Sequence, residues 1–118
     1  MKTKQELKEE YKNIIHPKGV FKITNKINGK IFVGSSPNLD SKWNSQKFQL
    51  NMNSHPNKEL QKDWNELGED NFYYEIIDTV NLKDSDTKKD YTSDINDLLE
   101  VYLDELQPYN TKGYNKKI

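Results

Sequence analysis

Few side chains in this sequence are thiols or imidazoles, the groups that most often act as nucleophiles, acid–base catalysts or zinc ligands near neutral pH. The 118 residues include no cysteine and only two histidines, His16 and His55. The lack of cysteine excludes disulfides, thiolate zinc sites and a cysteine nucleophile, and two imidazoles are too few for a histidine metal cluster. All 18 cations are lysine, so the planar guanidinium fork that grips a phosphate best is missing. The charged groups available for binding an anion are therefore lysine ammonium groups.

These lysines are distributed unevenly along the chain. Residues 1–62 contain 12 lysines and 5 acidic residues, whereas residues 63–118 contain 6 lysines and 14 acidic residues. A basic half can attract an anionic ligand weakly, but a pI near 6.1 argues against the strongly basic surface of an avid nucleic-acid binder. The alternative is that these charges only solvate the surface.

The length predicts one domain with a single core. Only 32% of the residues are hydrophobic, so the core must be built from a few large side chains such as Trp43, Trp64, Phe48 and Phe72. No apolar run reaches the roughly 18–20 residues that cross a bilayer, and the first residues contain no apolar stretch typical of a secretory signal. We therefore predict a cytoplasmic protein with no membrane association.

Residues 19–34, GVFKITNKINGKIFVG, predict a β-hairpin. Two β-branched runs flank Asn28-Gly29, a pair that supplies the positive φ angles of a tight two-residue turn. Phe21 and Phe32 lie near the outer ends of the two runs.

Hydrophobic spacing predicts the elements on either side of this hairpin. Thr3 and Glu6 form a capping box for an amphipathic helix, so residues 1–17 are expected to form an N-terminal helix and residues 18–118 the remaining domain. The further elements expected, in chain order, are helices at about 39–51 and 57–67, a strand at 72–78, a polar surface excursion at 80–94, and a last helix from about 95 to 106.

This order of elements resembles the GIY-YIG nuclease family over about residues 19–115. The segments that carry the resemblance are GVFKITNKINGKIFVGSS, NLDSKWNSQ, NKELQKDWNELGEDNF and LQPYNTKGYN. The resemblance implies an α/β (α+β) fold, in which a three-stranded antiparallel sheet is flanked by helices, here with an extra N-terminal helix. Family members cut DNA phosphodiesters with one divalent metal ion, and the family name records two tyrosines, one in each strand of the hairpin.

The same resemblance indicates that the catalytic groups are missing. Phe21 and Phe32 stand where the family has its two tyrosines, and a phenyl ring can neither donate nor accept a proton. Lys42 stands where the family has an arginine that steadies the phosphate, and it keeps the charge without the bidentate fork. Gln46 stands where the family has a proton-shuttling histidine, and an amide has no useful pKa near neutrality.

The family's metal-binding glutamate matches Leu99 rather than its neighbour Glu100. Counted back from Leu103 and Leu106, the family spacing falls on Leu99. On a helical wheel Leu99 lies in the apolar arc of the last helix and Glu100 lies well outside it. Leucine has no oxygen to offer a metal ion.

The family's C-terminal asparagine matches Asn110 or Asn115, and the spacing does not choose between them. Because the proton-transfer groups, the phosphate clamp and the metal ligand are all replaced, we predict a pseudo-nuclease without a metal or other cofactor. Weak metal-dependent DNA cleavage remains an alternative, through a shifted register that brings Glu100 together with Lys42.

Two functions other than catalysis remain open. The first is a binding protein in which Phe21, Phe32, Lys42 and Gln46 form a pocket that binds or sequesters a phosphate-bearing ligand, a nucleotide or nucleic acid, as a decoy does. The second is an interaction or inhibitor module that acts on an active nuclease or another partner, or forms a homodimer, through the apolar face of the N-terminal helix.

Two structural interpretations compete with a binding pocket. Phe21, Phe32 and Leu99 can instead fill the former cleft as ordinary core residues. His55, which precedes a proline in an expected loop, is interpreted as structural or solvent-facing rather than as a ligand. The bias of the sequence toward lysine and asparagine is typical of AT-rich genomes and points to a phage or mobile-element origin.

Overall fold

A computed structural model describes residues 16–80 and 91–116 of the chain. Its elements, in chain order, are β1 (Gly19–Asn25), β2 (Ile31–Ser36), α2 (Leu39–Asn51), α3 (Lys58–Leu67), the short 3-10 helix η1 (Glu69–Asn71), β3 (Phe72–Thr79) and α4 (Thr92–Leu106). The N-terminal helix expected over residues 1–17 falls almost entirely outside the described residues, so that prediction and the associated domain boundary remain open.

The polar excursion predicted for residues 80–94 also falls mostly outside the described residues, but its end needs correction. Residues 92–94 form the first turn of α4 rather than part of a surface loop. Polar and acidic residues suit this position, because the first turn of a helix has unpaired N–H groups and favours negative charge such as that of Asp94.

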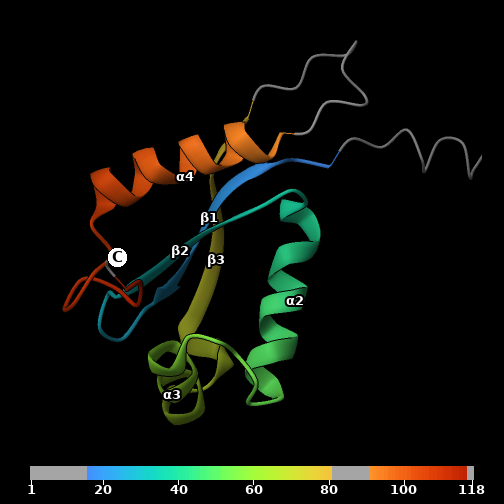
Figure 1. Cartoon of the computed structure of the whole chain (residues 1–118). Helices are drawn as coiled ribbons and strands as arrows, with labels where there is room; N and C mark the ends of the chain where they lie inside the picture. Colours follow the sequence, from blue (N-terminus) through green and yellow to red (C-terminus); the bar gives the residue numbers. More distant parts are fainter. Residues whose placement is uncertain (1–15, 81–90, 117–118) are drawn as a thin grey trace, which may run out of the picture.

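The three strands form one antiparallel sheet in the order β2-β1-β3, which confirms the predicted sheet. Phe21 of β1 pairs with Gly34 of β2 and with Ile76 of β3, and an irregularity in register lies between Val20 and Phe21. In Figure 1 the strands run between α4 on one side and α2 on the other, with α3 near the far end of the sheet. This arrangement gives the α+β layers expected from the order of elements.

The hairpin is confirmed, but its turn is longer than the two-residue turn that Asn28-Gly29 predicts. The Asn25 N–H donates to the Lys30 carbonyl (2.9 Å) and the Gly29 N–H donates to the Asn25 carbonyl (2.8 Å), so four residues separate the ends of the ladder. Asn25 Oδ1 also accepts from the Ile27 N–H (2.8 Å). An asparagine side chain that accepts a hydrogen bond from the backbone N–H two residues later favours a wider turn. Of the four loop residues, only the last, Gly29, has a positive φ (76°).

Side-chain caps set the starts of the helices that follow. Asn38 Oδ1 accepts from the Ser41 N–H at the start of α2, and Asn57 Oδ1 accepts from the Leu60 N–H (3.0 Å) at the start of α3. Gly68, with φ 86°, ends α3. The predicted bounds of both helices are confirmed to within one residue. In the described part of the chain, no helix has the length and apolar character needed to span a membrane.

The main core lies between the sheet and the helices α2 and α3. Its buried members are Phe21, Ile23, Leu39, Leu50, Leu60, Trp64, Phe72 and Tyr114. Other buried apolar residues, including Val33 and Ile95, lie outside this cluster, and α4 contacts β1 and β2. Because Val33 follows Phe32 in the same strand, the two side chains point to opposite faces, so α4 covers the face of the sheet that α2 and α3 leave open.

The prediction that Phe48 belongs to the core is wrong, because its side chain is 67% exposed. The buried residues of α2 are Leu39, Gln46 and Leu50. At about 100° per residue, Phe48 lies about 180° from Leu39 around the helix axis, on the solvent side. Leu50 fills the inward position near the end of α2.

Candidate functional site

The rings of Phe21 and Phe32 lie side by side, as predicted, with their centroids 6.3 Å apart in an edge-to-face arrangement. The strand register explains this contact, because Phe32 is two residues from Gly34, the partner of Phe21, and so projects from the same face. A Cβ on Gly34 would lie 2.6 Å from Phe21 Cζ, which means that the Phe21 ring rests directly on that glycine. Phe21 is only 1% exposed and therefore forms the floor of the site.

Tyr74 of β3 extends this aromatic floor. Its ring stacks on Phe21 (5.3 Å between centroids) and on Trp43 of α2 (5.5 Å). The Tyr74 hydroxyl donates to the Leu39 carbonyl (2.8 Å). Burial, and then the negative charge of Asp40, raises the pKa of Tyr74 to about 12, so this hydroxyl stays protonated and keeps α2 fixed to the sheet.

Lys42 lies above the floor. Its Nζ is 5.9 Å from the centroid of the Phe21 ring, within the range of a cation–π interaction. No ion pair joins Lys42 to a carboxylate within residues 16–80 and 91–116. The ammonium group therefore keeps an unneutralised positive charge beside the two phenyl rings.

Gln46, one turn after Lys42, is held by a histidine to which the sequence pattern assigned no part in the site. His55 Nδ1 accepts from the Asn57 N–H (3.0 Å), so the ring proton must be on Nε2, which donates to Gln46 Oε1 (2.6 Å). The His55 ring also contacts Phe32 edge to face at 5.6 Å. Gln46 is 5% exposed and His55 is 1% exposed, so His55 is not solvent-facing.

One signal in the sequence could have revealed this histidine. Gln46 lies seven residues after Leu39, on the inward side of α2, and a buried amide requires a hydrogen-bonding partner. The imidazole that meets this requirement comes from the loop between α2 and α3, a tertiary contact that spacing alone does not reveal.

Burial lowers the pKa of His55 below its ordinary value of 6.5, and the positive charge of Lys42 lowers it further. The unfolded chain therefore binds a proton at His55 more readily than the folded chain does. The neutral, buried His55 contributes its full stabilisation at pH 7, and this contribution is lost as the pH falls below about 6.5. We expect the free energy of unfolding of the wild type to fall more steeply from pH 7 to pH 5 than that of a His55→Gln variant. Denaturant unfolding at each pH measures both slopes, and parallel curves would contradict a neutral buried imidazole.

The two candidate asparagines occupy different environments. Asn115 Nδ2 donates to the Val33 carbonyl (2.8 Å), and Asn115 Oδ1 accepts from the Val33 N–H (2.9 Å). Asn115 thus pairs with the outer edge of β2, next to Phe32. Asn110 is exposed, with φ 57°. Of the two, Asn115 is therefore the one that contacts the hairpin.

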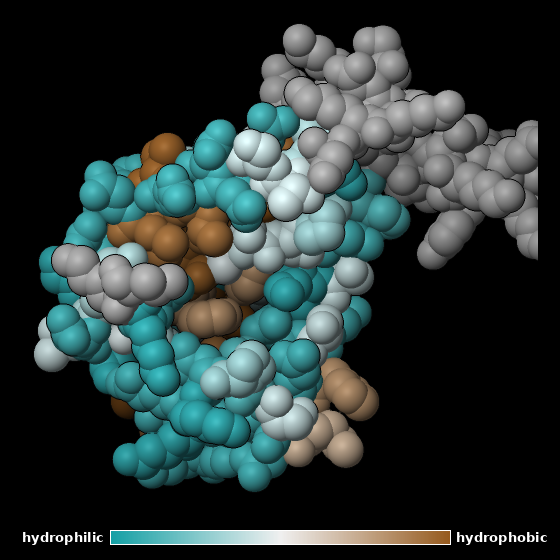
Figure 2. Space-filling model, in the orientation of Figure 1, coloured by the Kyte–Doolittle hydropathy of each residue, from teal (hydrophilic) through white to brown (hydrophobic). Residues whose placement is uncertain are grey.

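Leu99 is half-buried on α4, whereas Glu100 is exposed, in line with the helical-wheel argument. The expectation that Leu99 lies opposite the two phenyl rings is wrong, because α4 covers the other face of the sheet and Leu99 is not among the residues packed against the core that contains Phe21. Figure 2 shows hydrophobic side chains gathered in a hollow below α4, surrounded by polar residues. Across the described segments, no three histidine, aspartate or glutamate side chains are grouped as ligands for a metal ion.

The sheet order, the flanking helices and the paired aromatic rings define a GIY-YIG-like α+β domain, and the fold expected from the sequence resemblance is thereby confirmed. The chain is similar to the catalytic domain of the homing endonuclease I-TevI, with a TM-score of 0.69 and 23% identity over 86% of this chain and 99% of that one. A mutant of the same catalytic domain gives a TM-score of 0.68 at 23% identity, over 84% and 92% of the two chains. No protein-family model and no curated protein matches the sequence.

Proposed function

We propose that this protein is a non-catalytic binding protein with a nuclease-type fold, which binds or sequesters a phosphate-bearing ligand, a nucleotide or nucleic acid, beside α2. The observation that carries this proposal is the pair of donors formed by Lys42 and Gln46, one helical turn apart over the aromatic floor.

Both side chains can donate to a ligand. His55 occupies the Gln46 carbonyl oxygen, and no described residue accepts a hydrogen bond from the Gln46 amide nitrogen. Lys42 supplies the positive charge, and side chains four residues apart on a helix are close enough to contact one small group. Phosphate oxygens accept hydrogen bonds from both donor types, and the partly buried Phe32 ring suits contact with an aromatic base.

The chemistry of the site favours binding over hydrolysis. Phe21 and Phe32 carry no hydroxyl that could handle a proton. Both nitrogens of His55 are engaged, Nδ1 by the Asn57 N–H and Nε2 by Gln46, so this imidazole is held away from acid–base work in the cleft. The absence of a free base at these positions supports a pseudo-nuclease.

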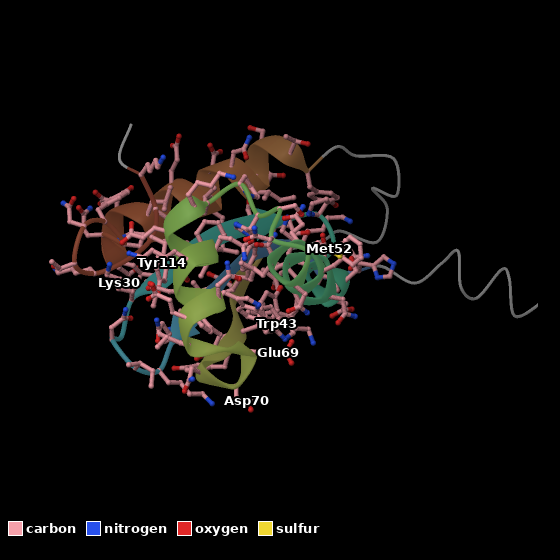
Figure 3. The ribbon with its side chains drawn as sticks, turned by 90° about the horizontal axis from the view of Figure 1, so that it is seen from below. Lys30, Trp43, Met52, Glu69, Asp70 and Tyr114 are labelled. Carbon is pink, nitrogen blue, oxygen red and sulfur yellow. The ribbon has the colours of Figure 1, made fainter. Side chains whose placement is uncertain are left out.

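An exposed apolar pair favours protein interaction as a second candidate function. Phe48 and Met52, four residues apart on the solvent side of α2, are 67% and 63% exposed. Met52 lies at the end of α2 in Figure 3. Adjacent exposed apolar side chains are typical of surfaces that contact other proteins.

Replacing Lys42 with alanine is expected to weaken the binding of a nucleoside monophosphate or short oligonucleotide about five- to tenfold, because one charge-assisted contact is lost. Lys47→Ala is the matched control. Lys47 is also half-buried on α2 and lies over an aromatic ring, that of Trp43, at 5.3 Å. We expect its removal to leave the affinity within about twofold. Calorimetric titration of the three proteins measures the difference.

Equal affinities for the wild type and Lys42→Ala would contradict this proposal, because the ligand would then bind elsewhere.

A cleavage assay tests the nuclease alternative. Incubation of purified protein with DNA and millimolar magnesium or manganese is expected to give no cleavage. Cleavage that Lys42→Ala abolishes would establish the nuclease alternative instead, because a contaminating nuclease would not respond to the substitution.

A further inference from the structure

A second polar site lies on α3, apart from the aromatic floor. It is a surface pocket of about 410 Å³, lined by Asn53, Lys58, Gln61, Lys62, Asn65 and Glu66. All of these residues except Asn53 come from α3, where the spacing of i, i+3, i+4, i+7 and i+8 puts them on one face. Asn53 follows the end of α2 and closes the opposite side.

The wall of this pocket is held by a chain of amide hydrogen bonds. Gln61 is 5% exposed, and its Nε2 donates both to the Leu50 carbonyl (2.8 Å) and to Asn65 Oδ1 (3.0 Å). Asn65 Nδ2 then donates to Asn53 Oδ1 (3.0 Å). The last of these contacts uses only the carbonyl oxygen of Asn53, so the Asn53 Nδ2 remains as a donor with no acceptor in the described part of the chain.

The charge of the pocket is positive. Lys58 and Lys62 are exposed and one helical turn apart, and neither forms an ion pair with a carboxylate of the described residues. Lys58 is also the first residue of α3, where unpaired backbone N–H groups and the helix dipole add positive potential. Glu66, the single carboxylate of the lining, lies at the other end, so two ammonium groups face one negative charge.

We propose that this pocket on α3 is a phosphate-binding site that works independently of Lys42. Lysine ammonium groups and amide N–H groups are donors that suit phosphate oxygens, whereas two adjacent ammonium groups would repel a metal cation. The volume falls within the range of small-molecule pockets, which leaves room for an organic group attached to the phosphate. The phosphate can belong to a phosphate monoester or to the diester of a polynucleotide.

The test is a nuclear magnetic resonance titration of the full chain with inorganic phosphate, adenosine 5′-monophosphate and a short oligothymidylate in separate arms. We expect saturable shifts of the backbone amides in the first turn of α3 and of the Asn53 and Asn65 side-chain amides. Saturation by the monophosphate but not by the oligonucleotide identifies a monoester site, and the reverse identifies a diester site.

Substitutions assign these shifts to the pocket. Lys58→Ala and Lys62→Ala are each expected to weaken binding about five- to tenfold, and Lys62→Arg is expected to retain it. Glu66→Gln is expected to strengthen binding about threefold or more, because it removes the one opposing charge. Lys112→Ala, which changes an exposed lysine outside the pocket, is the control and should behave as the wild type does.

Linear, unsaturated shifts in every arm, or affinities unchanged by Lys58→Ala and Lys62→Ala, would overturn the proposal. All three positions on α3 are exposed, so these variants are expected to fold. This test of the α3 pocket can fail without affecting the function proposed for the aromatic site, and that function can fail without affecting the α3 pocket. Lys42→Ala should leave the α3 shifts unchanged, and loss of the α3 site should leave the effect of Lys42 intact.

Discussion

Replacing Phe21 with alanine is expected to lower the free energy of unfolding by about 3–5 kcal/mol, the cost of removing a large aromatic side chain from a packed core. The ring is 1% exposed and contacts both Phe32 and Tyr74. It also rests on Gly34, which has no side chain to fill the space that the ring leaves. Chemical denaturation followed by circular dichroism measures the change.

Phe48→Ala is the matched control, because it removes the same side chain from a position that is 67% exposed. We expect this control to change the free energy of unfolding by less than about 0.5 kcal/mol. Similar losses for the two variants would mean that the Phe21 ring contributes little packing, and the aromatic floor of the proposed ligand site would then be far looser than its contacts suggest.

Tyr114→Phe is expected to cost about 2–3 kcal/mol although it removes only one oxygen, because that oxygen satisfies two other groups. The Tyr114 hydroxyl donates to Asp63 Oδ2 (2.6 Å) and accepts from Asn25 Nδ2 (2.9 Å). Burial, and then the bond to Asp63, raises the pKa of Tyr114, so the hydroxyl is protonated at neutral pH. Without it, Asn25, which is 0% exposed, keeps a buried amide with no acceptor for that N–H.

Thermal and denaturant unfolding measure this loss. Tyr73→Phe is the control, since Tyr73 is 38% exposed on the sheet and its hydroxyl could bond to water. We expect it to change stability by less than about 0.5 kcal/mol. Figure 3 shows Lys30 beside Tyr114, where its Nζ lies 5.6 Å from the ring centroid and also pairs with Glu59 (2.6 Å). If Tyr114→Phe were neutral, these contacts and the packing of the ring, rather than the hydroxyl, would hold the segment in place.

Local patterns in the sequence were sufficient to predict most of the fold. Asn57 and Gly68 bound α3 because capping depends on residues that are close in the chain. The hairpin follows in the same way from its alternating strands. Its turn was misjudged because the Asn25 side chain bonds to the loop backbone, and a count of turn residues does not include that competition.

The candidate site was harder to predict, since tertiary contacts define it. The contact between Phe21 and Phe32 was expected from the family resemblance, but the register that produces it depends on the four-residue turn, which the sequence pattern did not predict. The role of His55 depends on a loop folding back onto Gln46, which no local spacing encodes. Phe48 was misassigned because hydrophobicity was given more weight than its angle around α2, although the burial of Gln46 follows from that same geometry.

The bond between Asn25 and Tyr114 joins residues 89 positions apart in the chain. Gly113 and Asn115 lie on either side of this tyrosine and contact Ile31 and Val33 along the outer edge of β2. During synthesis, the hairpin therefore emerges long before the residues that complete its edge and satisfy its buried asparagine. Such distant contacts slow folding, and an unpaired strand edge is a site of aggregation until it is covered. A nascent chain that stops before residue 113 leaves β2 open to pairing with another molecule.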